Sequence, residues 1–289
     1  MNRTNYDFAL VGGDMRQVYM VNDLINRNYS VIVYELYDSL LNTSCARAKT
    51  LAEAINKSLT IITPIPVTKD GSNINTKFTD RNISIDELCN LLTPSKKLFG
   101  GCLTTKMKNH CEEKGIFYDD LMENEEITLF NTIATAEGTI VEAIINSTTN
   151  LHGSRCLIIG YGKCANTLAY KLKNMCGSID IAARSSLALA QAGAASYGTV
   201  NLSQLEQVID HYDYIFNTVP AMILTKSLLS KTKENVTIID IASNPGGVDY
   251  SYAKEINRNA KLCLGLPGKY APQSSAVFLN NYILLKLGK

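Results

Sequence analysis

Histidine is scarce in this chain of 289 residues, which contains only His110, His152 and His211. Three scattered imidazoles argue against a metal site built on histidine. The eight cysteines include no C-x-x-C pair, the spacing that zinc sites and dithiol redox sites use. We therefore expect reduced thiols, no metal site and a cytoplasmic location.

Net charge is also nearly absent, because 28 basic side chains oppose 27 acidic ones. A balance of +1 provides no electrostatic attraction for nucleic acid or for an anionic membrane surface. No apolar run approaches the ~20 residues that a membrane-spanning helix needs. The first apolar stretch continues into glycines, as a first strand does and a signal peptide does not.

Short β-branched runs alternate with helix-like stretches along the whole chain, which is typical of α/β proteins with parallel sheets. The pattern predicts two doubly wound, Rossmann-like domains at residues 1–130 and 150–271, joined by a long helix at 131–149. By analogy with two-domain dehydrogenases, a terminal helix at 272–289 is expected to return to the first domain. Strands are predicted at Phe8–Gly12, Val31–Glu35, Leu59–Thr63, Leu98–Gly101, Cys156–Gly160, Ile179–Ala183, Tyr214–Val219, Thr237–Ala242 and Leu262–Leu266.

A glycine-rich turn in the second half has the layout of a dinucleotide site. Gly160, Gly162 and Ala165 fit G-x-G-x-x-A between a predicted strand and a predicted helix. The first glycine permits a tight turn, the second admits a pyrophosphate, and the helix N-terminus favours its negative charge. This assigns the nucleotide to the second domain and leaves substrate binding and catalysis to the first. The residues expected at the turn are Gly160, Gly162, Lys163 and Cys164.

The end of the next strand decides which dinucleotide binds, because NAD-binding domains place an acid there for the ribose 2′-hydroxyl. Asp180 has the expected spacing of about 20 residues from Gly160, but it stands inside the predicted strand and not at its tip. The tip is Ala183-Arg184-Ser185-Ser186, whose guanidinium and hydroxyls suit a 2′-phosphate. The sequence therefore favours NADP over NAD as the cofactor.

Several prolines stand just past predicted strands, where the carboxyl ends of parallel strands form a ligand crevice. Three further residues at or just past these strand ends are expected to contact the cofactor: Val219, Pro220 and Ala242.

An ordered set of motifs carries a family resemblance. These motifs are VGGDMRQ at 11–17, AEGT at 136–139, LHGS at 151–154, AARSS at 182–186, NTVPAMIL at 217–224, ASNPGG at 242–247 and GLPGKYAP at 265–272. Together they resemble the A subunit of bacterial dipicolinate synthase over essentially the whole chain. The resemblance implies a sporulation enzyme of the mother cell. With a flavoprotein B subunit and NADP, it oxidises (hydroxy)tetrahydro- or dihydrodipicolinate to pyridine-2,6-dicarboxylate.

Such a reaction needs groups that hold two carboxylates and move a proton. The candidates are Arg16 for a carboxylate, Thr63 and Asn217 as polar crevice groups, and Glu137 as acid or base. Glu137 is expected to open a helix, where a carboxylate also stabilises the first turn without any catalytic role.

Two other functions stay open, and so does assembly of the chain with itself. A D-2-hydroxyacid-type dehydrogenase has the same architecture, but it needs a late histidine, and none follows His211. A non-catalytic NADP-binding partner of a flavoprotein fits the small number of acid–base residues.

Overall fold

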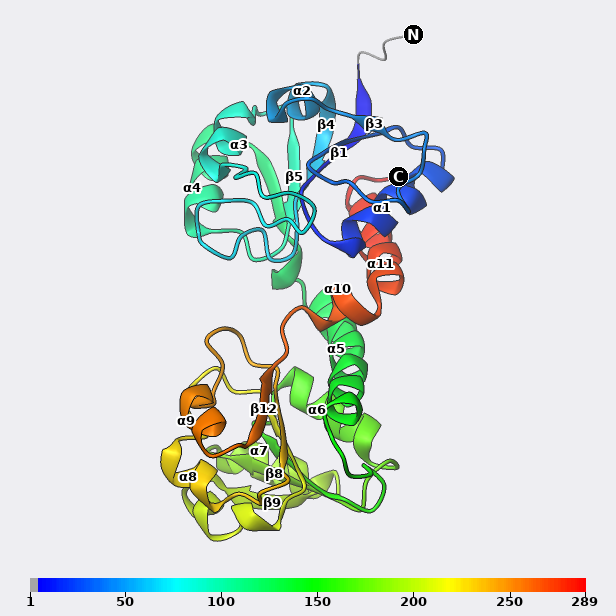
Figure 1. Cartoon of the computed structure of the whole chain (residues 1–289). Helices are drawn as coiled ribbons and strands as arrows, with labels where there is room; N and C mark the ends of the chain where they lie inside the picture. Colours follow the sequence, from blue (N-terminus) through cyan, green and yellow to red (C-terminus); the bar gives the residue numbers. More distant parts are fainter. Residues whose placement is uncertain (1–4) are drawn as a thin grey trace. The chain divides into compact units, whose positions relative to one another are not determined.

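The computed structural model describes residues 5–289 and contains two α/β units (Figure 1). One unit comprises Met1–Thr128 with Ala271–Lys289, and the other comprises Leu129–Tyr270. Each holds a six-stranded parallel sheet flanked by helices. The prediction of two Rossmann-like α/β domains is therefore confirmed. Among the described residues, no helix is long and apolar enough to cross a membrane.

The sheet of the first unit has the order β3-β2-β1-β4-β5-β6, in which strand addition reverses direction between β1 and β4. The inner strands are apolar because a parallel sheet covered by helices is buried on both faces. Its elements are β1 (Tyr6–Val11), α1 (Met15–Asn26), β2 (Val31–Tyr34), β3 (Ala46–Arg47), α2 (Leu51–Asn56), β4 (Ser58–Ile62), α3 (Ile85–Leu91), β5 (Lys97–Gly100), α4 (Thr105–Lys114), β6 (Phe117–Asp120) and the 3₁₀ turn η1 (Leu121–Glu123).

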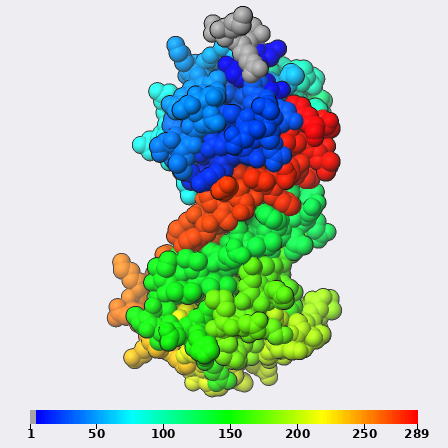
Figure 2. Space-filling view, turned by 90° about the vertical axis from the view of Figure 1, so that its right-hand side faces the viewer, coloured from blue at the N-terminus to red at the C-terminus, as the bar shows by residue number. Residues whose placement is uncertain are grey.

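The C-terminal helix α11 (Pro272–Lys286) packs against α1 in this first unit (Figures 1 and 2). Its buried apolar residues, among them Leu279 and Ile283, join the same core cluster as the inner face of α1. The buried Asn280 also donates to the carbonyl oxygen of Met20 at 3.0 Å and to a carboxylate oxygen of Asp23 at 2.8 Å. Apolar burial and two hydrogen bonds thus join the end of the chain to its first helix.

The sheet of the second unit repeats the same topology, in the order β12-β11-β10-β7-β8-β9. Its direction reverses between β7 and β10, the point where doubly wound sheets open a ligand crevice. Its elements are β7 (Arg155–Ile159), α6 (Lys163–Leu172), β8 (Ser178–Ala183), α7 (Ser186–Ala194), β9 (Gly198–Asn201), the 3₁₀ turns η2 (Leu202–Gln207) and η3 (Ile209–His211), β10 (Tyr214–Asn217), α8 (Lys226–Lys231), β11 (Thr237–Asp240), α9 (Tyr250–Glu255), β12 (Asn259–Leu262) and α10 (Leu266–Tyr270).

The long central helix α5 spans Glu125–Ile145, so it begins and ends earlier than the predicted 131–149. Asn124 caps it, since its side-chain oxygen accepts from the backbone N–H of Ile127 at 3.0 Å, and two acids follow in the first turn. Glu137 consequently lies in the middle of α5. The expectation that it opens a helix is wrong.

Candidate nucleotide site

A pocket of about 610 Å³ lies at the carboxyl edge of the second sheet. Residues at the ends of β7 and β8 contribute to it, together with the loop after β10, so it opens beside the reversal of strand order. This is the position where a doubly wound sheet binds a dinucleotide. The pocket is lined by Ile159, Gly160, Tyr161, Gly162, Ala182, Ala183, Arg184, Ser185, Ala188, Leu202, Val219 and Ile223.

The turn after β7 requires glycine at its first position. Gly160 has a φ of +94°, and an added Cβ would lie 2.5 Å from the hydroxyl oxygen of Thr218 and 2.9 Å from a methyl of Val219. Its N–H donates to the carbonyl oxygen of Ala182 at 2.8 Å, which ties the turn to β8. The backbone can therefore turn sharply at the sheet edge only because this residue lacks a side chain.

The helix that follows presents an uncapped N-terminus to the pocket. Gly162 is the N-cap of α6, no side chain caps the helix there, and an added Cβ would meet nothing within 4 Å. Ala165 and Leu168 on the opposite face are fully buried against the sheet, which fixes the helix axis. Free N–H groups, the helix dipole and open space together suit a bound phosphate.

The tip of β8 carries a positive side chain and a hydroxyl. Arg184 is exposed beside the pocket, and Ser185 caps α7 through a 3.3 Å bond from the N–H of Ala188. Asp180 lies inside β8, as the sequence predicted, and its carboxylate accepts from the hydroxyl of Tyr212 at 2.7 Å. No acid therefore stands at the strand tip, where NAD-binding domains use one.

The structure brings six of the predicted cofactor residues into this one pocket: Gly160, Gly162, Ala183, Arg184, Ser185 and Val219. The other five are close in sequence but do not line it: Lys163, Cys164, Ser186, Pro220 and Ala242. Sequence reasoning missed the apolar walls formed by Tyr161, Ala188, Leu202 and Ile223. Tyr161 stands inside the G-x-G turn, at a position where the pattern sets no residue type, and the other three belong to separate turns and helices that meet only in the fold.

Arg16, predicted to hold a substrate carboxylate, is 5% exposed in the first unit. Its Nε and Nη2 donate to the two carboxylate oxygens of Asp14 at 3.0 and 2.9 Å, and Nη2 also bonds the carbonyl of Ile65. Burial raises the pKa of Asp14, but the hydrogen bonds and charge of Arg16 outweigh it and lower that pKa. The pair lies where β1 meets α1, at the carboxyl edge of its sheet.

The remaining candidates also have partners within their own units. The hydroxyl of Thr63 is buried and donates to the carbonyl oxygen of Phe99 at 3.2 Å. Glu137 is exposed and pairs with Lys171 on α6 at 2.8 Å. Asn217 is fully buried and belongs to a network at the end of β10. Their roles toward a substrate stay predictions.

Sequence reasoning missed the buried carboxylate at the centre of that network. Asp240 ends β11 and is fully buried, with Asn217 and Tyr250 both donating to it. Burial raises the pKa of Tyr250, and its bond to Asp240 raises it further. The sequence indicates this residue only by its position, because Asp240 stands near the end of a clearly apolar predicted strand, shortly before ASNPGG.

Glu142 forms a second buried cluster, on α5. Its carboxylate accepts from Lys261 at 2.9 Å, from Lys269 at 2.5 Å and from the hydroxyl of Tyr270 at 2.8 Å. Burial raises its pKa, but the bonds from Lys269, Lys261 and Tyr270 outweigh burial and lower that pKa to about 2. The cluster ties α5 to β12 and α10 within the second unit.

The lowered pKa of Glu142 predicts how the stability of the fold depends on acidic pH. Because its folded pKa is depressed, its contribution is fully present above the ordinary value of 4.5 and is lost as the pH falls toward about 2. We expect Glu142→Gln to lower the free energy of unfolding by about 3 kcal/mol near neutral pH. The variant should also lose less stability on acidification. Urea unfolding of both chains at several pH values measures this, and identical pH profiles would contradict it.

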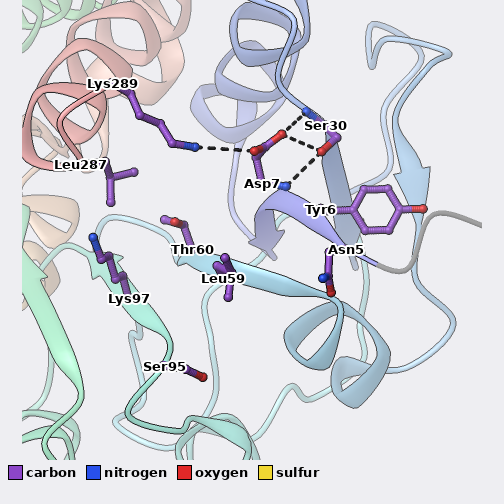
Figure 3. A pocket seen from close by; sticks show the side chains of 10 residues that line it. All are labelled: Asn5, Tyr6, Asp7, Ser30, Leu59, Thr60, Ser95, Lys97, Leu287 and Lys289. Atoms are coloured by element: carbon purple, nitrogen blue, oxygen red, sulfur yellow. Dashed lines mark hydrogen bonds and ion pairs between the residues drawn. The ribbon is translucent and has the colours of Figure 1, made fainter.

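Another pocket, of about 420 Å³, lies at the amino edge of the first sheet (Figure 3). Its carboxylate, Asp7, already accepts from the N–H and hydroxyl of Ser30 at 2.8 and 2.7 Å, and Lys289 lies 3.6 Å away. Doubly wound sheets bind ligands outside the carboxyl ends of their strands. The pocket beside β7 and β10 is therefore the candidate site.

Two family models match different parts of the chain. Residues 7–122 match the N-terminal domain of the dipicolinate synthase A subunit, and residues 141–260 match the shikimate / quinate 5-dehydrogenase family. The second unit is accordingly a nicotinamide-nucleotide domain of the dehydrogenase type, and the chain is part of an oxidoreductase.

Whole-chain comparisons agree with the first match. The dipicolinate synthase A subunit of Bacillus subtilis is 28% identical over 98% of this chain and 96% of its own length. The crystal structure of the dipicolinate synthase A subunit from Bacillus halodurans superposes with a TM-score of 0.86 at 24% identity, covering all of both chains. D-lactate dehydrogenase of Escherichia coli shares the fold alone, with a TM-score of 0.64 at 13% identity over 98% of each chain. The chain is therefore similar to dipicolinate synthase A subunits over nearly its whole length.

Proposed function

We propose that the chain is the NADP-dependent subunit of a dipicolinate synthase in the cytoplasm of a sporulating mother cell. Its reaction is the oxidation of (hydroxy)tetrahydro- or dihydrodipicolinate to pyridine-2,6-dicarboxylate. The observation that carries the proposal is the pocket at the carboxyl edge of the second sheet. There a glycine turn, an uncapped helix N-terminus and an arginine converge in a chain similar to dipicolinate synthase A subunits.

The residues present fit NADP. The N-terminus of α6 would hold the pyrophosphate, and Arg184 with Ser185 would hold the 2′-phosphate. The apolar side chains of Leu202 and Ile223 would enclose the adenine. When bound, the nicotinamide supplies the hydride acceptor, and the chain's own part is to bind, orient and exclude water.

Cofactor choice is tested at the strand tip. We expect the chain to bind NADPH more tightly than NADH. Arg184→Ala removes a charge-assisted hydrogen bond to the 2′-phosphate, so it should lower the ratio of NADPH affinity to NADH affinity about tenfold. The control is Arg155→Ala, which removes an exposed arginine from the opposite end of the same sheet and should leave this ratio of affinities unchanged. Calorimetric titration measures both affinities. A preference for NADH in the unmutated chain would overturn the assignment.

Arg16 is the proposed carboxylate ligand of the first unit. Its Nε and Nη2 are already bonded to Asp14 and Ile65, so Nη1 would meet the substrate. The substrate role of Thr63 and Asn217 and the acid–base role of Glu137 are proposals of the same kind. Each of the three must bind substrate alongside its present partner or exchange that partner.

The synthase reaction is expected to need the flavoprotein B subunit. The polar candidates in this chain are all bonded within it, which leaves no free acid–base pair among them. Dipicolinate formation, followed by ultraviolet absorbance, should be weak with this chain alone and strong when the flavoprotein is added. Full activity of the isolated chain would remove the partner from the proposal.

Because the polar candidates are already bonded within the chain, a second function is also favoured: a non-catalytic NADP-binding subunit that supports the flavoprotein. The two are separated by asking whether the reaction consumes NADP. Stoichiometric NADPH formation together with dipicolinate supports the catalytic role. Dipicolinate formation without NADPH supports the non-catalytic one.

A further inference from the structure

We propose that Asp240 is a positioning residue for the nicotinamide half of the cofactor, because its buried carboxylate holds together the loops that follow β10 and β11. The inference rests on the proposed function. Arg184 places the adenosine end on the β8 side of the sheet, so a dinucleotide that crosses the reversal of strand order reaches β10 and β11 with its other half.

Asp240 is completely buried and uses both oxygens fully. Oδ1 accepts from Nδ2 of Asn217 and from the N–H of Ala242, both at 2.9 Å. Oδ2 accepts from the N–H of Gly247 at 2.6 Å and from the hydroxyl of Tyr250 at 2.8 Å. One carboxylate thus joins the end of β10 to two points of the loop after β11 and to the first residue of α9.

Asn217 extends this connection into the pocket. Its second Nδ2 proton is donated to the carbonyl oxygen of Val219 at 3.0 Å, and its Oδ1 accepts from the N–H of Val219 at 3.2 Å. Val219 lines the candidate nucleotide pocket. Both amide protons of Asn217 are spent in this way, so it transmits the position of Asp240 to the pocket wall.

The two loops fit so closely that a small shift in one must move the other. A Cβ added at Gly247 would lie 2.5 Å from the carbonyl oxygen of Ala221 and 2.5 Å from Nδ2 of Asn217. The carbonyl of Gly247 also accepts from the N–H groups of Ile223 and Leu224 at 3.0 and 2.9 Å. Ile223 is itself a pocket residue.

A buried charge is costly unless hydrogen bonds compensate it, and each bond that compensates Asp240 also fixes a group in one of these two loops or at the start of α9. Four compensating donors come from backbone and side chains at the ligand edge of the sheet. Binding sites need such support, because loops left without it hold a ligand imprecisely.

The test compares two ligands of the unmutated chain and of Asp240→Asn by calorimetry. NADPH occupies the whole site, whereas 2′,5′-ADP occupies only the adenosine half. An asparagine keeps one acceptor oxygen but turns an NH₂ group toward the donors of Gly247 and Tyr250. We expect NADPH affinity to fall about tenfold or more, with 2′,5′-ADP affinity changed by less than about twofold.

Two further variants complete the design. Tyr250→Phe removes one of the four bonds and keeps the charge, so it should shift the ratio of the two affinities less but in the same direction. It carries the test if Asp240→Asn fails to fold. Asp213→Asn makes the same substitution at the amino edge, where Asp213 accepts from Lys233 at 2.6 Å, and it should leave the ratio unchanged.

An equal loss of both affinities, or no change in Tyr250→Phe, would overturn the inference. If the unmutated chain binds 2′,5′-ADP as tightly as NADPH, the inference fails while the nucleotide site stands. If it binds neither, the proposed function itself fails, and the inference falls with it.

Discussion

The Gly162→Asp variant is expected to lose nucleotide binding without losing stability. Gly162 has φ −80° and ψ −172°, a conformation open to any residue, and an added Cβ would meet nothing within 4 Å. Aspartate is a preferred N-cap, so the helix should gain a few tenths of a kcal/mol. Its carboxylate would occupy the pyrophosphate position. Since like charges in contact cost several kcal/mol, NADPH affinity should fall at least ~100-fold.

Gly162→Ser is the matched control, because serine caps the helix without adding charge. It should keep the thermal stability of Gly162→Asp and retain more of the NADPH affinity than the aspartate variant. Titration with NADPH measures the affinity, and thermal unfolding measures the stability, of the unmutated chain and the two variants. An unchanged NADPH affinity in Gly162→Asp would contradict a pyrophosphate site at the N-terminus of α6.

The Arg16→Met variant should lower the free energy of unfolding by about 3–5 kcal/mol, because it leaves the buried carboxylate of Asp14 without its partner. Adding Asp14→Asn removes that charge and keeps an N-cap oxygen for α1, so the double variant should regain most of the loss. Urea unfolding of the two single variants and the double variant measures the coupling. Strict additivity of the two single losses would contradict a buried ion pair.

The double variant also tests the substrate role of Arg16 in a folded protein. If the guanidinium binds a carboxylate equally in the ground and transition states, the apparent KM for the substrate should rise about tenfold with kcat unchanged. The assay uses the chain together with the proposed flavoprotein partner. An unchanged KM would limit Arg16 to its structural role.

The sequence predicts the inner strands well and the edge strands poorly. β1, β4, β7 and β10 are buried on both faces and therefore appear as apolar runs. The edge strands β3, β6 and β9 were not predicted, because they are short, exposed or polar. The last edge strand, β12, ends at Leu262, so the predicted strand at Leu262–Leu266 was wrong apart from its first residue.

In the candidate site, too, local sequence patterns predict some residues and not others. Gly160 and Gly162 could be predicted because the G-x-G-x-x-A pattern fixes their spacing, and Arg184 could be predicted because it stands at the tip of the next strand. The walls at Leu202 and Ile223 depend on which loops meet in space, and no local pattern encodes that. The asparagine at the end of β10 was predicted as a crevice group, but its hydrogen bonds make it part of the Asp240 network.

The most direct measurement is a crystal structure of the chain grown with NADP. We expect a nucleotide at the carboxyl edge of the second sheet, with its pyrophosphate at the N-terminus of α6 and its 2′-phosphate on Arg184 and Ser185. The nicotinamide should lie toward the loops after β10 and β11. A nucleotide bound elsewhere, or an empty pocket at saturating NADP, would contradict the assignment of this pocket as the NADP site.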